Sequence, residues 1–481
     1  MTPARPWFAV LLLAGCSVVF DPARHDEPEG IAEHPRLNQA CDRDDDCGPN
    51  LFCTPGGEPR VCQGCWGGGG QVAREPISGE VTSLSIGVQQ LEAPVAGVVG
   101  RLFIAWTADL GEGAVVRLRM YPIHGDGFVG DMDREVDTSA SSSVVAVPVG
   151  VALVSGSSEP PVIGVAGRRA DGISAVWIGT VDATVEPGRL VADGLLPPDG
   201  IELPPDEQIV DSFVLQTPVQ PWDAPTPEPL ASDAAVAVYR VARGMDVALG
   251  RSDLRGPHWL GVPDGVSLRP SRGALGVTGH LVVAADDEEH AVLGSLIGER
   301  LEAIPVPTPG RTAAPALGTL GAFWSGGIQD RIFDVRVLAW PSADGQLHLE
   351  AYDCVEHCRS DALPERAIAW IGDGVGVRTV AMASSRAGPA VGTIEVWPEE
   401  DRIAVRVLDD LLWPAALPGN GRRVRLDASR AGVRYLPPLA MHRVVWDGFD
   451  HAFVAAVEED AGEGPHLALW APYSCGGAGG L

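Results

Sequence analysis

Short apolar runs, each about the length of a β-strand, recur along most of this 481-residue chain. They are rich in valine, isoleucine and aromatic residues, and many alternate apolar and polar positions. Beyond the N-terminus, none has the 3.6-residue period of an amphipathic helix. Representative runs are RLFIAWTA at 101, SAVWIGTV at 174, AAVAVYRVA at 234, RIFDVRVLAW at 331 and HAFVAAVE at 451. The pattern predicts an all-β domain over residues 81–481.

Turn dipeptides join several of these runs in pairs. Asp171-Gly172 separates VIGVAG from SAVWIGTV, and Asp344-Gly345 separates VRVLAW from QLHLEAY. Such dipeptides supply the positive φ angles that tight hairpins need. The first strands of the predicted hairpins lie near residues 103, 162, 236, 281, 332, 390 and 452.

This recurrence resembles the blades of a β-propeller, whose repeats span about 40–50 residues. The gaps here are longer and irregular, and the proline-rich stretch 196–230 accounts for the widest one. We therefore predict a β-propeller of about seven blades, with kelch/WD40-like architecture but no strict kelch, WD40 or Asp-box motif. Six or eight blades stay open, and tandem β-sandwiches are the alternative.

The N-terminus, MTPARPWFAVLLLAGCS, has a basic start, an apolar run and then small residues. The run is too short to span a bilayer, which needs about 20 residues, and predicts a secretory signal over residues 1–15. Leu13-Ala14-Gly15-Cys16 resembles the lipobox of bacterial lipoproteins. The resemblance implies cleavage before Cys16, lipid on that residue and, because Ser17 follows, an outer-membrane location facing periplasm or surface. An ordinary signal peptide with a chance cysteine is the alternative.

Residues 16–40 are polar and contain proline, so they predict a flexible tether with a reach on the order of 25 Å. Four glycines at 67–70 open a predicted hinge over residues 67–80. Between them lies a cysteine-rich segment, 41–66.

Nine cysteines occur in the chain, and eight remain if Cys16 carries lipid. An even number in an exported protein predicts four disulfides. Five of the eight fall within residues 41–65, so one must pair outside that segment. Cys354 and Cys358 most simply pair with each other, which leaves Cys475 to pair with a cysteine of that segment. We predict Cys65 as this partner, because it is the last cysteine before the large domain. The eight candidates are Cys41, Cys47, Cys53, Cys62, Cys65, Cys354, Cys358 and Cys475.

The spacing C-x5-C-x5-C-x8-C-x2-C over residues 41–65 resembles the Dickkopf N-terminal-like module. The resemblance implies a small disulfide knot and carries no signalling role with it.

Asp42, Asp44 and Asp46 suggest a calcium loop within the same segment. An EF-hand counted from Asp42 needs Gly at position 6 and Glu at position 12, where this chain has Cys47 and Cys53. We therefore predict solvated acids here and no cofactor, with calcium as the weaker alternative. A zinc site from Cys354, His357 and Cys358 would lack a fourth ligand.

The net charge is −29 and the pI is about 4.6, so nucleic acid is not expected as a partner. All 35 basic residues are arginine, which excludes Schiff-base lysines and P-loops. We find no G-x-S-x-G, H-E-x-x-H or G-x-G-x-x-G motif, so the sequence assigns no catalytic residue and leans away from an enzyme. DDEEH at 286–290 is the densest acidic cluster of the domain, and a charged hairpin tip explains it more simply than a cation site.

Three hypotheses follow from the sequence. The first is a lipid-anchored binding protein that presents a propeller to a protein or glycan partner in the cell envelope. The second is a glycan hydrolase or lyase with carboxylates at the propeller channel. The third is a structural envelope lipoprotein. The first is favoured because propellers bind other molecules more often than these residues suggest chemistry, which is an argument by analogy of fold.

Overall fold

The computed structural model shows a chain built of β-strands, without a helix among the residues that it describes. Those residues are 39–40, 51–53, 62–64, 71–111, 114–124, 129–130, 134–137, 147–154, 161–181, 196–216, 236–243, 246–253, 256–260, 275–278, 281–285, 289–297, 300–322, 333–353, 368–370, 376–385, 388–396, 401–407, 422–426, 432–446, 449–460, 462–471 and 473–474. Within these ranges no helix could cross a membrane.

Seven sheets of one design make up the described part of residues 71–474, and we call each sheet a blade. Every blade is an antiparallel meander whose neighbouring strands pair in order. Blades 1 to 3 contain β4 (Glu80–Val95), β5 (Val98–Asp109), β6 (Ala114–His124), β7 (Arg134–Asp137); β8 (Val147–Val154), β9 (Val162–Arg168), β10 (Ser174–Thr180), β11 (Leu196–Glu202); β12 (Glu207–Gln216), β13 (Val236–Arg243), β14 (Asp246–Asp253), β15 (Gly256–Leu260).

Blades 4 to 6 repeat this order, and blade 7 takes its fourth strand from before blade 1. Their strands are β16 (Leu275–Thr278), β17 (Leu281–Ala285), β18 (His290–Ile297), β19 (Arg300–Pro307); β20 (Ala316–Ala322), β21 (Phe333–Pro341), β22 (Leu347–Asp353), β23 (Ile368–Trp370); β24 (Gly376–Ser385), β25 (Gly388–Val396), β26 (Asp401–Val407), β27 (Arg422–Leu426); β28 (Val433–Trp446), β29 (Phe449–Asp460), β30 (Gly464–Trp470), β3 (Gln71–Pro76), with β31 (Tyr473–Ser474) also on β29.

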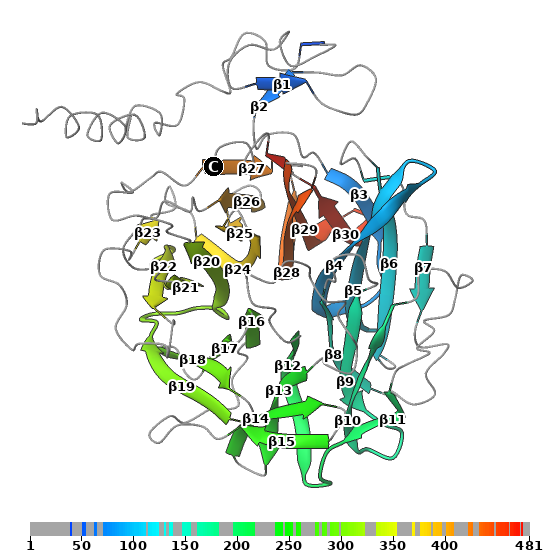
Figure 1. The fold of residues 1–481 in the computed structure, drawn as a ribbon, viewed down its shortest axis with the longest axis vertical. Coiled ribbons are helices and arrows are strands. Elements are labelled where there is room, and N and C mark those ends of the chain that lie inside the picture. The colour runs from blue at the N-terminus through cyan, green and yellow to red at the C-terminus, as the bar shows by residue number, and fades with distance from the viewer. Residues whose placement is uncertain are drawn as a thin grey trace, which may run out of the picture.

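The first strands of the blades contact one another in a complete ring. The contacts run from β4 to β8, β12, β16, β20, β24 and β28, and from β28 back to β4. Figure 1 shows the blades set around a common centre in chain order. The protein is therefore a β-propeller of seven blades, as predicted, and not a pair of β-sandwiches.

The seven predicted hairpin starts all fall in or beside the second strand of a blade, from β5 and β9 through to β29. We expected them to be first strands of hairpins, but in every blade another strand precedes them. The second strand gives the strongest sequence signal because it lies in the middle of its sheet and packs on both faces.

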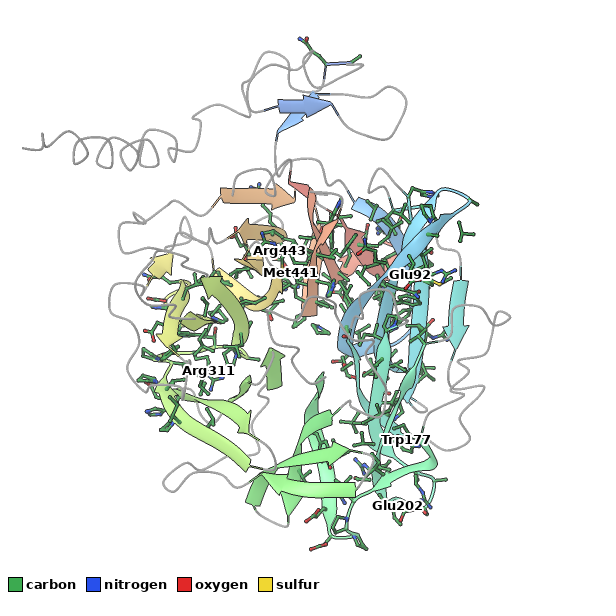
Figure 2. All side chains as sticks on the ribbon, viewed as in Figure 1. Glu92, Trp177, Glu202, Arg311, Met441 and Arg443 are labelled. Carbon is green, nitrogen blue, oxygen red and sulfur yellow. The ribbon has the colours of Figure 1, made fainter. Side chains whose placement is uncertain are left out.

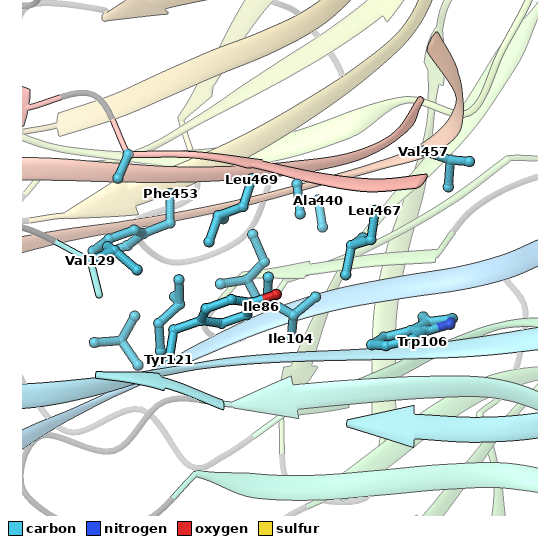
Figure 3. Close-up of a cluster of buried hydrophobic side chains, with 14 of the residues drawn as sticks. Ile86, Ile104, Trp106, Tyr121, Val129, Ala440, Phe453, Val457, Leu467 and Leu469 are labelled. Atoms are coloured by element: carbon cyan, nitrogen blue, oxygen red, sulfur yellow. The ribbon is translucent and has the colours of Figure 1, made fainter. Parts of the chain in front are cut away.

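Strand β5 shows this two-sided burial clearly. Leu102, Ile104 and Trp106 pack toward blade 7, whereas Phe103 and Ala105 pack toward blade 2. Figure 3 shows the first of these clusters, where side chains of β4–β6 meet those of β28–β30. Each described core cluster likewise joins two neighbouring blades, so no blade has a core of its own.

Four tryptophans belong to these cores and not to a binding surface. Trp106, Trp177, Trp340 and Trp470 are each at most 1% exposed. Trp106 and Trp340 lie on second strands, whereas Trp177 and Trp470 lie on third strands. Tryptophan therefore serves core packing at these four positions, although they do not share one blade position.

Strand β3 closes the ring. It comes before blade 1 in the chain, yet it pairs antiparallel with β30 as the fourth strand of blade 7. Its residues 71–76 lie within the segment 67–80 for which we expected a hinge. The disulfide between Cys65 and Cys475, which would also join the two ends of the domain, lies outside the described residues and stays a prediction.

Polar contacts hold β3 from both neighbouring blades. Arg74 Nε donates to Glu458 Oε1 at 2.6 Å and Nη1 to Glu463 Oε2 at 2.5 Å, both in blade 7. From blade 1, Arg119 Nη2 donates to the Pro76 carbonyl at 3.3 Å while its guanidinium lies 5.1 Å from the ring centre of Trp106.

Within the cysteine-rich segment the structure describes one hairpin, β1 (Leu51–Cys53) and β2 (Cys62–Gly64). Cys53 stands directly opposite Cys62 in its antiparallel register.

Replacing Arg74 by methionine should destabilise the propeller. The change leaves Glu458, whose side chain is 2% exposed, without this cation. We expect the free energy of unfolding to fall by about 2 kcal/mol, below the loss for a fully buried pair because Arg74 keeps 16% exposure. Urea unfolding measures it.

Arg169→Met is the matched control, since Arg169 also binds two carboxylates, Asp171 and Glu202, but at an exposed turn of blade 2. It should change stability little. Equal losses in both variants would contradict a special role for the closing strand.

Candidate functional site: the turn face

Two kinds of connection meet on one side of the propeller, which we call the turn face. They are the turns between second and third strands and the links from the fourth strand to the next blade. Backbone hydrogen bonds join them, from Leu203 to Ser174, from Thr312 to Pro341 and from Ile77 to Pro465, with nitrogen–oxygen distances of 2.9, 2.9 and 3.0 Å. The bonds join a turn to a link at these three places on the turn face.

The link from blade 2 to blade 3 is held by the first residue of a third strand. The hydroxyl of Ser174, at the start of β10, accepts a bond of 3.3 Å from the amide of Ile209, the third residue of β12. In the turn between β9 and β10, Arg169 binds Asp171 at 2.5 Å and also Glu202. Figure 2 labels Glu202 on this blade.

The same positions are bonded between blades 6 and 7. Asp401, the first residue of β26, accepts a bond of 3.1 Å from the amide of Tyr435, the third residue of β28. Arg378 completes the contact, since its Nη1 donates to Asp401 at 2.8 Å and to the Tyr435 carbonyl at 2.6 Å. The hydroxyl of Ser174 and the buried carboxylate of Asp401 thus both hold the first strand of the next blade.

Between blades 4 and 5 a buried arginine holds the link. Arg311 donates to the His290 carbonyl at 3.1 Å and to the Thr308 hydroxyl at 3.2 Å. The amide of Ala343, in the turn of blade 5, donates to the Gly310 carbonyl at 2.8 Å. Arg311 is labelled beside these two blades in Figure 2.

Four of the turns are fixed by an aspartate that accepts a bond from the backbone amide two residues later. This local bond stabilises the bend and tolerates little motion of the carboxylate. The pairs are Asp109 with Gly111 at 2.8 Å, Asp171 with Ile173 at 3.1 Å, Asp344 with Gln346 at 3.1 Å and Asp460 with Gly462 at 2.9 Å.

Carboxylates of these turns reach solvent. Asp171, Glu202, Asp344 and Glu463 have side chains between 44% and 56% exposed. At Asp344, hydrogen bonds from the Ser342 hydroxyl and the Gln346 amide hold the pKa of the carboxyl below its ordinary value. The turn face therefore presents fixed negative charges at neutral pH.

One group of side chains has the residue types of a nucleophilic triad but not its order. Ser342 donates its hydroxyl to Asp344, and Nε2 of His348 lies 4.0 Å from the same carboxylate oxygen. The carboxylate thus stands between serine and histidine, so the imidazole cannot take the serine proton directly. His348 instead stacks on Trp340, with ring centres 5.3 Å apart.

The innermost strand of blade 7 carries a histidine far from its ordinary titration range. His442 lies on β28 between Ala440 and Val444, which pack toward blade 1. Loss of hydration in this setting lowers the pKa of His442 to about 4. The imidazole is consequently neutral at physiological pH.

Most residues singled out in the sequence lie outside the described part of the chain. These are Cys16, Cys41, Cys47, Cys65, Cys354, Cys358, Cys475, Asp42, Asp44 and Asp46. Of the cluster 286–290 the structure describes Glu289 and His290, next to the Arg311 link. Among the described residues no group of three or more histidine, cysteine or acidic side chains could hold a metal ion.

Comparison with known proteins finds similarity in structure alone. No protein-family model matches the chain, and no curated protein matches its sequence. Similar solved structures include a mutant of the lectin of Aleuria aurantia in complex with alpha-methyl-L-fucoside, at 12% identity over 83% of this chain and 98% of the lectin, with a TM-score of 0.33.

Two further solved structures are similar to the chain at comparably low sequence identity. The Cps50 (Swd1) β-propeller domain of Myceliophteria thermophila is 9% identical over 83% of this chain and 98% of its own, with a TM-score of 0.37. A subtype N11 neuraminidase-like protein of A/flat-faced bat/Peru/033/2010 (H18N11) is 10% identical over 91% of this chain and 96% of its own, with a TM-score of 0.32. Identities this low carry no statement about ligands.

Acid should destabilise the propeller through His442. Between pH 6.5 and about 4 the unfolded histidine binds a proton that the folded one does not. Stability should therefore fall as the pH drops through this window, by at most about 3 kcal/mol from this group.

His442→Gln should flatten that part of the curve of unfolding free energy against pH. Near pH 8, about 1.5 units above the ordinary histidine pKa, histidine and glutamine are both neutral. The difference in unfolding free energy between the two proteins at this pH therefore gives the packing contribution alone. An unchanged slope in the variant would contradict this assignment.

Proposed function

We propose that the protein is a binding protein of the cell envelope, held by lipid on Cys16, whose turn face receives a protein or glycan partner. The observation that carries the proposal is the set of hydrogen bonds that hold the turns of that face in place. Its turns are bonded internally and to the links between blades, so their side chains need little further ordering when a partner binds.

The charge of the face indicates the chemistry of the partner. Exposed carboxylates at several blades, in a chain of net charge −29, attract a basic surface and also accept hydrogen bonds from sugar hydroxyls. We favour a protein with an arginine- or lysine-rich patch, because attraction between opposite charges acts over the whole face.

The lipid anchor completes the proposal. Its basis is the sequence Leu13-Ala14-Gly15-Cys16, together with the polar tether over 16–40. Several acyl chains give stable attachment, whereas a single chain binds only marginally. Attachment at one end of the chain would leave the propeller free to present a face to a partner.

Removing charge from the turn face should weaken capture of the partner. We suggest Asp171→Asn with Asp344→Asn, because the asparagine oxygen can still accept the turn bond while the charge is lost. Crosslinking and affinity capture from native membranes should recover at least tenfold less partner, and added salt should weaken the unaltered complex.

Glu92→Gln removes an exposed charge at the far end of blade 1 and serves as the control. Capture that is equal in all three proteins, or the recovery of no stoichiometric partner, would contradict the proposal.

A further inference from the structure

The hairpin of β4 and β5 ends in an apolar tip. Residues 93–99, with the sequence APVAGVV, carry no charge, and Val95 at 62% is the most exposed large hydrophobic side chain in the described ranges. The charged neighbour, Glu92, lies just before them. In a chain of net charge −29 an exposed uncharged tip of this kind is unusual and suggests an apolar contact.

The backbone of the tip is strained in a way that a polar residue would relieve. Ala96 has φ of 52° and Gly97 has φ of 82°, as a two-residue type I′ turn requires. Asparagine or glycine is the usual choice at the first position, because alanine is strained in the left-handed region. An added β-carbon on Gly97 would meet no atom within 4 Å, so open space surrounds this position of the tip.

The tip lies on the side of the propeller where the N-terminal segment enters. Strand β3 runs from Gln71, opposite Trp470, to Pro76, opposite His466, and its far end meets the turn face through the Ile77–Pro465 bond. Strand β4 then runs back in the opposite direction.

The hairpin extends well past the entry point of the chain. Strand β4 has 16 residues and β3 has 6, so at about 3.3 Å per residue the tip reaches roughly 30 Å further. Figure 1 shows this long hairpin extending beside β3. The tip and the chain entry are thus on one side, and the turn face is on the other.

We propose that residues 93–99 rest in the surface of the lipid bilayer to which Cys16 is anchored. This inference depends on the lipid anchor of the proposed function. The anchor holds the propeller close to the bilayer, where an uncharged tip on the entry side can approach anionic headgroups that repel the rest of this acidic chain. A tip this small binds lipid weakly alone, but tethering raises its local concentration.

The contact would orient the propeller. With the lipid anchor and the tip as two points of attachment on the entry side, the turn face points away from the membrane, toward its partner. A tether alone would leave the propeller free to rotate.

Photocrosslinking tests the contact in the full-length protein. Benzoylphenylalanine at position 95 should give lipid adducts in vesicles of phosphatidylethanolamine and phosphatidylglycerol, at a yield at least tenfold above that for the same residue at position 170. Ala170 is the control because it is also exposed but lies in the turn between β9 and β10, on the turn face. Equal yields, or protein adducts in place of lipid adducts at position 95, would overturn the proposal.

Acylation of Cys16 is measured on the same samples from the mass of the N-terminal peptide. Acylated protein without lipid adducts at position 95 overturns the tip contact and leaves the anchor standing. Protein without acyl chains contradicts the anchor, and the yield at position 95 then decides the tip contact by the same tenfold criterion.

Discussion

The structure depends on one constraint, which is that every blade must be covered on both faces. Alternate residues of a single strand feed two different cores, as Phe103 and Ile104 do on β5. A blade at the end of an open row would expose one of these faces, so the row must return on itself. Pairing between β3 and β30 makes that return, with Arg74 and Arg119 holding the closing strand from the blades on its two sides.

Closure gives the two sides of the propeller different roles. On the turn face, bonds such as Ser174 to Ile209 and Asp401 to Tyr435 lie between blades, so a ring that stays closed also keeps the polar turns in fixed relative positions. On the opposite side the chain enters and the β4–β5 hairpin extends. The proposed partner site and the proposed membrane contact therefore use opposite sides of the same propeller.

The sequence predicted the blades because burial on both faces leaves a strong apolar signal in each second strand. It did not predict the closing strand, since QVAREP is short and largely polar and follows a glycine run that indicated a hinge. Arg74 on this strand binds Glu458, which is 384 residues away, and no local spacing in the sequence can indicate such a contact. Likewise Ser174 and Asp401 share a role without sharing a residue type, so no repeat motif marks the turn face.

Amide hydrogen exchange along β3 and β30 tests the central claim most directly. If β3 closes the ring, the amides of Ala73 and Arg74 should exchange together with those of Leu467 and Leu469, and as slowly as the core of blade 1, because opening the seam uncovers both neighbouring blades. Fast exchange throughout β3 beside a protected β30 would contradict the account, because the ring would then hold without its closing strand.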